Sequence, residues 1–470
     1  MRRQQTRREF LASMAAGALA AGCAHSAPAG ATKPNIVFIL IDDLGWADLG
    51  CYGHAFHETP HIDGLAREGM RFTDAYAAAP VCSPTRASIM SGQYPARVGI
   101  TDFIAGHRRP WSKLRNVVNR QQYLPLESVT VAEALHEAGY VCGQFGKWHL
   151  GGRDYFPDRQ GFDTMLVSNG RHFNFKTVPK TPVEEGAYLA ETLTDHAEQF
   201  IETNKDRPFF LFLSHYAVHI PLDARRELIE KYEKKPKPDT GVNHPVYAAM
   251  VEHVDRSVGR ILETLSACGL DERTLVVFFS DNGGLRQRFD GDGPVVTTNA
   301  PLRDEKGTLY EGGIREPLIV RWPGVVTPGS VCRAPVSSVD FYPTWLEAAG
   351  AQRDAGHVLD GVSLTPLLAQ RGKPDRDALF WHYPHYHHST PASAVRQGDW
   401  KLLEFFEDGH LELYNLRKDL GETRNRAEEM PRKAEELQQK LASWRKTVNA
   451  AMPTPNPDYD PARQHEWGHR

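Results

Sequence analysis

The stretch Ile36-Val37-Phe38-Ile39-Leu40-Ile41, followed by Asp42-Asp43, decides the fold class of this 470-residue chain. An unbroken apolar run of this length, ended by two carboxylates, predicts a strand buried on both faces. Similar runs occupy residues 209–213 and 275–279, and a weaker one at 140–145 follows a predicted helix over 129–138. Apolar strands separated by helices are typical of a parallel sheet with helices on both faces. The sequence therefore predicts an α/β fold.

Polar side chains follow the ends of these four predicted strands. In chain order they are Asp42-Asp43, Lys147-Trp148-His149, His215 with His219, and Asp281-Asn282. Parallel sheets bind ligands outside the carboxyl ends of their strands, so we expect these groups to face one crevice. A single Asp-Asp pair is more often a helix cap or a turn, but four coincidences at strand ends favour a site.

The C-terminal part of the chain has a different pattern. Residues 361–377 are polar and interrupted by Pro and Gly, which predicts a boundary between a large domain (34–370) and a smaller subdomain (371–470). The subdomain's predicted elements are short strands at 394–396, 400–403 and 411–416 and an amphipathic helix over 430–448.

The N-terminal segment predicts export rather than a part of the fold. Thr6-Arg7-Arg8-Glu9-Phe10-Leu11 is similar to a twin-arginine export motif, and an apolar run follows. Leu19-Ala20-Ala21-Gly22-Cys23 is similar to a bacterial lipobox, which predicts a signal peptide over 1–23 and a lipidated Cys23. A plain signal peptide cut after Ala-His-Ser-Ala is the alternative. Both predict a protein exported from a bacterial cytoplasm; the first predicts a periplasmic or outer-membrane lipoprotein whose lipid is its only membrane contact.

Composition narrows the class of protein. A net charge of −4 and the absence of a long Lys/Arg run argue against a nucleic-acid partner. The six cysteines form no C-x-x-C pair, so a zinc cluster is not expected. An oxidising compartment permits a disulfide, but we expect Cys51, Cys142, Cys268 and Cys332 to be buried free thiols.

One polar stretch, Cys82-Ser83-Pro84-Thr85-Arg86, has the form C-x-P-x-R and continues into Ser91-Gly92-Gln93-Tyr94-Pro95. Gly146-Lys147-Trp148-His149, Ser280-Asp281-Asn282-Gly283 and KGTLYEGGIR (306–315) follow in order. With these motifs the chain resembles the type I, formylglycine-dependent sulfatases of the alkaline phosphatase superfamily, from Pro34 to the C-terminal helix. The resemblance implies an alkaline-phosphatase-like fold: a large, mostly parallel sheet between helices, with a smaller C-terminal subdomain of short antiparallel sheet plus helix.

The resemblance implies that a maturation enzyme oxidises Cys82 to formylglycine, whose hydrate attacks a sulfate ester. It also implies one divalent cation, and the ligands would be Asp42, Asp43, Asp281, Asn282 and the modified Cys82. Hard oxygen ligands suit Ca²⁺ or Mg²⁺ rather than zinc, and a carboxylate-rich set favours Ca²⁺.

The resemblance further implies catalytic roles for five basic residues. Lys147 and Lys306 would bind the equatorial sulfate oxygens, Arg86 would hold the hydrated aldehyde, His149 would deprotonate its second hydroxyl, and His219 would protonate the leaving alcohol. Taken singly, each has an ordinary alternative: a solvated surface lysine, a loop histidine or, for Cys82, a buried thiol.

Two segments rich in aromatic and polar residues remain, 169–174 and 381–388. Each could be a surface loop; the second could bind metal through its histidines; or both could form the rim of the crevice, where they would contact a sugar. The third reading predicts His172, Asn174, His385 and His387 as substrate-binding residues. The predicted reaction is exo-hydrolysis of a sulfated carbohydrate, with galactose or N-acetylgalactosamine 4-sulfate of a polysaccharide as the specific expectation.

Two rival functions share this pattern. A phosphatase or phosphonate monoester hydrolase would favour two metals, and Asn282 stands where the phosphatases that resemble this fold have a histidine. A non-catalytic glycan-binding lipoprotein would result if Cys82 stayed unmodified.

Overall fold

Strand β1 (Asn35–Ile41) lies in the interior of a ten-stranded sheet, as its apolar run predicts. In the computed structural model, which describes residues 33–106, 108–288 and 291–468, every residue of β1 is buried. Val37, Ile39 and Ile41 belong to one apolar cluster, and the residues between them belong to the cluster on the opposite face. Both faces of the strand are therefore covered, which is why the run shows no polar alternation.

The large sheet is mixed, with a parallel centre. Its order is β10-β2-β8-β7-β1-β6-β3-β4-β5, with β9 also paired to β2. Strands β7, β1, β6, β3 and β4 are parallel to one another, whereas β8 runs antiparallel to both β7 and β2. The remaining bounds are β2 Met70–Tyr76, β3 Val141–Gly146, β4 Thr164–Ser168, β5 Thr177–Val178, β6 Phe209–Ser214, β7 Thr274–Ser280, β8 Arg315–Arg321, β9 Ser330–Cys332 and β10 Val336–Ser337.

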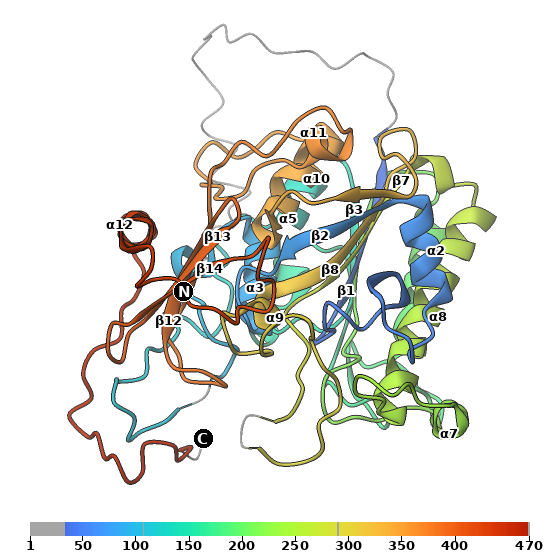
Figure 1. Cartoon of the computed structure of the whole chain (residues 1–470). Helices are drawn as coiled ribbons and strands as arrows, with labels where there is room; N and C mark the ends of the chain where they lie inside the picture. The colour runs from blue at the N-terminus through green and yellow to red at the C-terminus, as the bar shows by residue number, and fades with distance from the viewer. Residues whose placement is uncertain (1–32, 107, 289–290, 469–470) are drawn as a thin grey trace, which may run out of the picture. The chain divides into compact units, whose positions relative to one another are not determined.

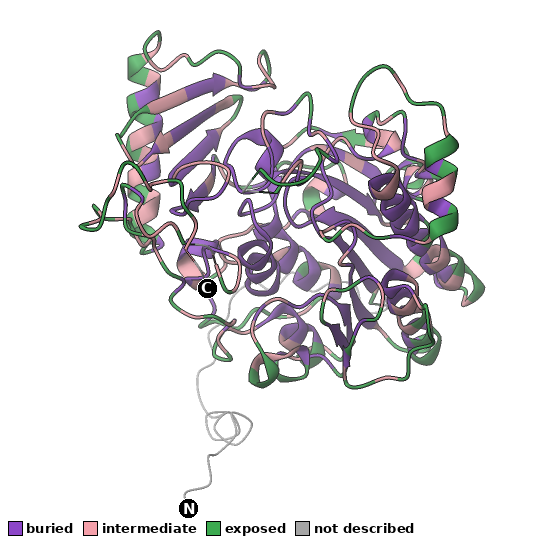
Figure 2. Cartoon of the chain, turned by 90° about the horizontal axis from the view of Figure 1, so that it is seen from below, coloured by how far each residue is buried: buried purple, intermediate pink, exposed green. Residues whose placement is uncertain are grey.

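Helices cover both faces of this sheet (Figure 1). The first apolar cluster joins it to α2 (Pro60–Glu68), α6 (Leu189–Asn204), α7 (Arg226–Lys234) and α8 (Pro245–Ala267). The second joins it to α3 (Cys82–Ser91), α5 (Val131–Glu137) and α10 (Phe341–Ala349). Figure 2 shows buried residues filling the strands and exposed residues on the outer surfaces of the helices.

A smaller antiparallel sheet follows near the C-terminus, in the order β11-β12-β13-β14. One face carries the C-terminal helix α12 (Pro431–Thr447) through residues such as Leu402 and Leu437. The other face packs against residues of the large sheet and its loops: Leu403 and Trp381 share an apolar cluster with Tyr76 of β2. The strand bounds are β11 Leu379–Tyr383, β12 Ala392–Gln397, β13 Trp400–Phe405 and β14 Leu411–Asn415. The remaining short α-helices of the described residues are α4 Pro95–Val98, α9 Glu311–Ile314 and α11 Thr365–Leu368.

The predicted α/β class with a smaller antiparallel C-terminal sheet plus helix is confirmed. Cys51, Cys142, Cys268 and Cys332 are free thiols, but Cys51 and Cys268 are only partly buried. Over the part of the chain that the structure describes, no helix is both long enough and apolar enough to span a bilayer. The predicted signal peptide and lipobox lie outside the described residues.

Candidate active site

A cavity of about 550 Å³ opens where the parallel strands end. This volume lies within the ~300–1,000 Å³ range of small-molecule sites. Lys147 and His149 after β3 and His219 after β6 contribute to its wall, as the strand-end argument predicts. The predicted groups after β1 and β7 are buried and do not line it. The lining residues are Cys82, Phe103, Ile104, Lys147, His149, Asn169, Gly170, Arg171, Tyr216, His219, Ile220, Pro221, Leu285, Arg288, Lys306 and His387.

Cys82 and His149 face each other at this wall. Cys82 is the first residue of α3, and its Sγ lies 3.2 Å from Nδ1 of His149. The other ring nitrogen, Nε2, is bonded to the Ile104 carbonyl, so Nε2 carries the proton and Nδ1 is the acceptor. Burial and the neighbouring Lys147 charge hold the pKa of His149 well below its usual value. The result is a neutral imidazole whose lone pair points at residue 82.

Four oxygen-bearing side chains meet beneath the cavity. Asp281 Oδ1 accepts the Asp43 amide at 3.3 Å, and Asn282 Nδ2 donates to Asp43 Oδ1 at 2.8 Å. Asp43 has a left-handed backbone, with φ of 64°, a conformation that the surrounding structure must stabilise. Asp42, Cys82 and Asp281 each place one ligand atom within 4.8 Å of the others.

Two oxygens of this group have no hydrogen-bond partner among the described residues: Asp42 Oδ1 and Asn282 Oδ1, both buried. Buried acceptors are nearly always satisfied, and a positively charged ligand would satisfy both of these oxygens. Carboxylate and amide oxygens are ligands that Ca²⁺ and Mg²⁺ prefer. The residues present therefore fit a hard divalent cation.

Two buried lysines neutralise this acidic group. Lys147 Nζ lies 2.5 Å from Asp42 Oδ2, and Lys306 Nζ lies 2.6 Å from Asp43 Oδ1. Burial disfavours the charged form of each lysine, but the adjacent carboxylate and the other acidic groups of the site together outweigh it, and both pKa values are raised. Both ammonium groups stay charged and also line the cavity, where an anion could bind.

Arg86 holds the site together from below. Its guanidinium donates to Asp281 Oδ2 at 2.9 Å, to the Lys147 carbonyl at 2.8 Å and to Ser214 Oγ at 2.6 Å. These partners stand at the ends of three strands, so the arginine ties α3 to the sheet. Its observed partners are thus Asp281 and two neighbouring strand ends, whereas the sequence predicted the residue 82 side chain.

His219 lines the cavity beside Asp43. Its Nδ1 donates to the Ile220 carbonyl at 2.6 Å, and its Nε2 lies 3.6 Å from Asp43 Oδ2. Burial lowers the pKa of His219, although Asp43 works in the opposite direction. His215, which follows the same strand, does not reach the cavity, because its Nε2 bonds Ser257 Oγ on α8 at 2.9 Å.

This arrangement matches one family over most of the chain. A family model described as Sulfatase matches residues 34–351. The chain belongs to the sulfatase family. A second family model, described as N-sulphoglucosamine sulphohydrolase, C-terminal, matches residues 304–448 of this sulfatase.

Individual relatives agree. A sulfatase of Formosa agariphila is 34% identical, over 88% of this chain and 88% of its own length. Human arylsulfatase A is 34% identical, over 87% of this chain and 85% of its own length. The crystal structure of Ps i-CgsB in complex with k-i-k-neocarrahexaose superposes with a TM-score of 0.76 at 29% identity, covering 93% of this chain and 95% of that one. The protein is thus a sulfuric ester hydrolase of the alkaline phosphatase superfamily.

The four predicted substrate-binding residues of this sulfatase do not share one position. His387 lines the cavity. His385 is buried and bonds Thr101 Oγ1 at 2.9 Å, and His172 is buried with Nε2 bonded to the His219 carbonyl at 3.1 Å. Asn174 is exposed and is not part of the wall. Sequence reasoning missed Arg171, although it lies within the 169–174 segment that was singled out.

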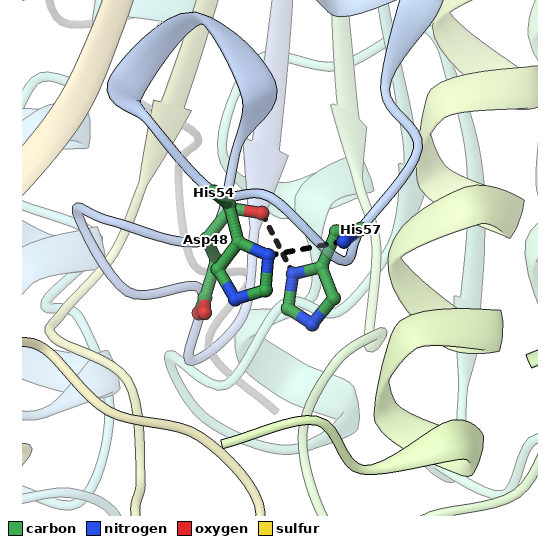
Figure 3. A group of neighbouring side chains, drawn as sticks. All are labelled: Asp48, His54 and His57. Atoms are coloured by element: carbon green, nitrogen blue, oxygen red, sulfur yellow. Dashed lines mark hydrogen bonds between the residues drawn. The ribbon is translucent and has the colours of Figure 1, made fainter. Parts of the chain in front are cut away.

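A second histidine cluster, Asp48 with His54 and His57, also has the spacing of a metal site (Figure 3). His54 Nδ1 accepts the amides of Phe56 and His57, so its proton is on Nε2, which cannot then coordinate. The two rings are stacked 3.5 Å apart at 12°, so their in-plane lone pairs do not converge on one point. The tautomer and the stacking both argue against a metal here.

Asp48 has a structural role instead. Its carboxylate accepts from the Gly45 amide at 2.8 Å and from the Tyr247 and Thr297 hydroxyls at 2.6 Å each. These bonds join the loop after β1 to α8 and to the loop that precedes Lys306. Asp48 thereby supports the backbone that carries Asp42 and Asp43.

Proposed function

We propose that this sulfatase removes sulfate from a sulfated carbohydrate, with hydrated formylglycine at residue 82 as the nucleophile and one divalent cation. The observation that carries the mechanism is the buried Cys82 facing the unprotonated Nδ1 of His149, above two unsatisfied oxygens. The carbohydrate is supported by the neocarrahexaose complex of Ps i-CgsB. A cavity of about 550 Å³ supports exo action on a terminal sugar, and we retain galactose or N-acetylgalactosamine 4-sulfate as the specific proposal.

The proposed cation ligands are Asp42, Asp43, Asp281, Asn282 and residue 82. The carboxylate-rich set supports Ca²⁺ over Mg²⁺. When bound, the cation would orient the nucleophile and withdraw charge from a sulfate oxygen. Lys147 and Lys306 would then share their carboxylate partners with the cation. Each ammonium group would be less fully neutralised and could attract the sulfate of the substrate.

Plain cysteine would be a poor nucleophile at this position. Burial raises the pKa of the Cys82 thiol, although Lys147 and Lys306 oppose the shift, so the reactive thiolate is disfavoured. A formylglycine hydrate would supply one hydroxyl to attack sulfur and a second whose deprotonation releases sulfate. All ten residues of α3 are buried, so the proposed maturation enzyme would have to act before the chain folds.

The chain's own groups have separable tasks in this reaction. His149 Nδ1 would accept the proton of the second hydroxyl, because its lone pair already faces residue 82. Lys147 and Lys306 would bind equatorial sulfate oxygens. His219 would protonate the leaving alcohol from its imidazolium form: the Ile220 carbonyl holds the Nδ1 proton, and the proton that Nε2 donates is one whose uptake the Asp43 carboxylate favours.

Competing 4-nitrophenyl sulfate against 4-nitrophenyl phosphate tests the reaction class. We expect higher kcat/KM for the sulfate; a preference for the phosphate would support the phosphatase rival. Cys82→Ala should remove turnover while the melting temperature stays close to that of the parent, since the deleted sulfur is small and its partner, His149 Nδ1, lies in the cavity wall rather than in the core.

Peptide mass spectrometry of the active enzyme tests the nucleophile. We expect the peptide containing residue 82 to be lighter by the thiol-to-aldehyde difference. Active enzyme carrying only unmodified cysteine would overturn the mechanism and leave the sulfatase assignment in place.

Export as a lipoprotein is a separate proposal, supported by the motifs at residues 6–11 and 19–23. Labelled palmitate should be incorporated by the full chain and not by Cys23→Ala. Incorporation by both would show that the lipid is attached elsewhere.

A further inference from the structure

Arg171 is a cation in the cavity wall that the proposed mechanism does not use. It lies between β4 and β5 and is exposed. No residue that the structure describes forms a hydrogen bond or ion pair with it. The other cations of the wall are committed: Lys147 and Lys306 to aspartates, and Arg288 to Asp292 at 3.8 Å.

The wall offers Arg171 no carboxylate either. Among its described lining residues there is neither Asp nor Glu. An arginine in such a wall leaves the cavity with an excess of positive charge beyond that required by one sulfate. The excess favours a substrate with a second negative charge.

The loop that carries Arg171 is anchored on both sides. Gly170, at φ of +77°, packs so closely on Tyr216 that a Cβ would lie 2.7 Å from its ring. Tyr216 in turn donates to the Ser168 carbonyl at 2.6 Å. On the other side, His172 is buried, bonds the His219 carbonyl at 3.1 Å and accepts the Leu189 amide at 2.8 Å. Arg171 is thus presented on a fixed backbone that also contacts the His219 segment, and a preorganised donor loses less freedom on binding.

We propose that Arg171 is a specificity-determining residue that binds a second anionic group of the substrate, a sulfate or a carboxylate near the scissile sulfate ester. The proposal rests on the proposed function and deepens it: the substrate class becomes a saccharide with at least two anionic groups. The planar guanidinium fork matches the oxygens of either group in a bidentate arrangement.

Inhibition of 4-nitrophenyl sulfate hydrolysis by three saccharides tests this: N-acetylgalactosamine 4-sulfate, its 4,6-disulfate, and a glucuronate-containing disaccharide with one 4-sulfate. We expect the holoenzyme to bind at least one dianionic saccharide more tightly than the monosulfate, and the arm that does so identifies the second group. Arg171→Gln should raise the Ki of that saccharide by about ten-fold or more, and that of the monosulfate by less than about three-fold.

Two further variants sharpen the test. Arg171→Lys keeps the charge and loses the fork, so its Ki should lie between those of the parent and Arg171→Gln. Arg153 is an exposed arginine outside the wall. Arg153→Gln should leave the ratio of the Ki of the tighter-binding dianionic saccharide to the Ki of the monosulfate unchanged. Equal effects of Arg171→Gln on all three saccharides, or no binding by any of them, would overturn the inference, whereas loss of aryl sulfate turnover in the parent would overturn the proposed function itself.

Discussion

At the scale of single residues, the chemistry depends on which nitrogen of each histidine carries the proton. The Ile104 carbonyl accepts a hydrogen bond from His149 Nε2, so Nδ1 of that ring faces residue 82 as an acceptor. The Ile220 carbonyl accepts a hydrogen bond from His219 Nδ1, so Nε2 of the second ring lies beside Asp43. Two backbone carbonyls thus give the rings opposite tautomers, and each neutral ring keeps an acceptor nitrogen toward the cavity. His149 can act there as a base, whereas His219 can act as an acid only after Nε2 takes up a proton, which the Asp43 carboxylate favours.

Replacing His219 by Gln should lower kcat/KM for a sugar sulfate by about 10²-fold or more, because an alkoxide needs protonation to leave. The loss for 4-nitrophenyl sulfate should be far smaller, since nitrophenolate leaves unaided. Kinetics over a series of leaving-group pKa values measure the difference.

His215→Gln is the matched control. This histidine follows the same strand but bonds Ser257 on α8, so its replacement should leave the leaving-group dependence unchanged. Equal losses of His219→Gln on both substrates would remove its general-acid role.

At the scale of elements, a buried ion cluster joins the smaller sheet to the segment that carries Lys306. Lys401 of β13 lies 2.8 Å from Glu311 at the start of α9 and 2.9 Å from Glu422. Glu422 also accepts the Glu311 amide at 2.7 Å. Breaking a buried pair leaves a charge uncompensated, so this cluster couples the packing of the C-terminal sheet to the 306–315 segment.

The same cluster predicts a pH dependence of stability. Burial and Glu311 raise the pKa of Glu422 from 4.5 to about 7, against the pull of Lys401. Because the folded carboxyl keeps its proton to higher pH than the unfolded one, its contribution is complete below pH 4.5 and is lost as the pH rises through 7. The contribution of this carboxyl to the free energy of unfolding should therefore fall across that window by on the order of 1–3 kcal/mol.

Glu422→Gln should remove this contribution, so the free energy of unfolding of the variant, measured by urea unfolding at several pH values between 4.5 and 7.5, should change with pH by a more positive slope than that of the parent. Glu137→Gln, an exposed glutamate on α5, should keep the parental slope. An unchanged slope in Glu422→Gln would show that its folded and unfolded pKa values are alike.

At the scale of the whole molecule, the site exists only when distant segments meet at one edge of the sheet. Asp42 and Asn282 follow adjacent parallel strands, and Lys306 approaches from the chain that leads into α9. Gly283 permits this approach, because a Cβ there would lie 1.9 Å from the Gly312 carbonyl. A ligand of this site therefore binds the folded state and not the unfolded chain.

Calcium should raise the melting temperature of the metal-free enzyme by a few degrees, since a ligand at 100 times its Kd stabilises the folded state by about 2.7 kcal/mol. Asn282→Ala should reduce the shift, and a parallel titration with Mg²⁺ compares the two ions. His57→Gln should preserve the shift, because the second histidine cluster does not have the tautomers for a metal. A shift lost in His57→Gln and kept in Asn282→Ala would relocate the cation.

Local sequence determined most of the fold and supplied the groups that we propose to react. Apolar runs bounded by polar residues specify buried strands through burial alone. Residues after β3 and β6 reach the cavity wall, and those after β1 and β7 lie buried beside it, because parallel strands end at one edge. The motif around Cys82 predicts the position of the nucleophile, and the structure places Cys82 in the cavity wall opposite His149.

Only the tertiary structure decided where side chains in loops point. His385 and His387 are two residues apart, yet one packs on Thr101 and the other lines the cavity. His215 turns to α8, and Arg171 enters the wall because Tyr216 and His219 anchor its loop. The orientation of each of these loop side chains is set by a partner far away in sequence. In a strand, by contrast, the backbone itself makes successive side chains alternate between the two faces. The sequence by itself therefore determined which groups this sulfatase has at its strand ends, and long-range packing decided which nitrogen, oxygen or guanidinium of them faces the substrate.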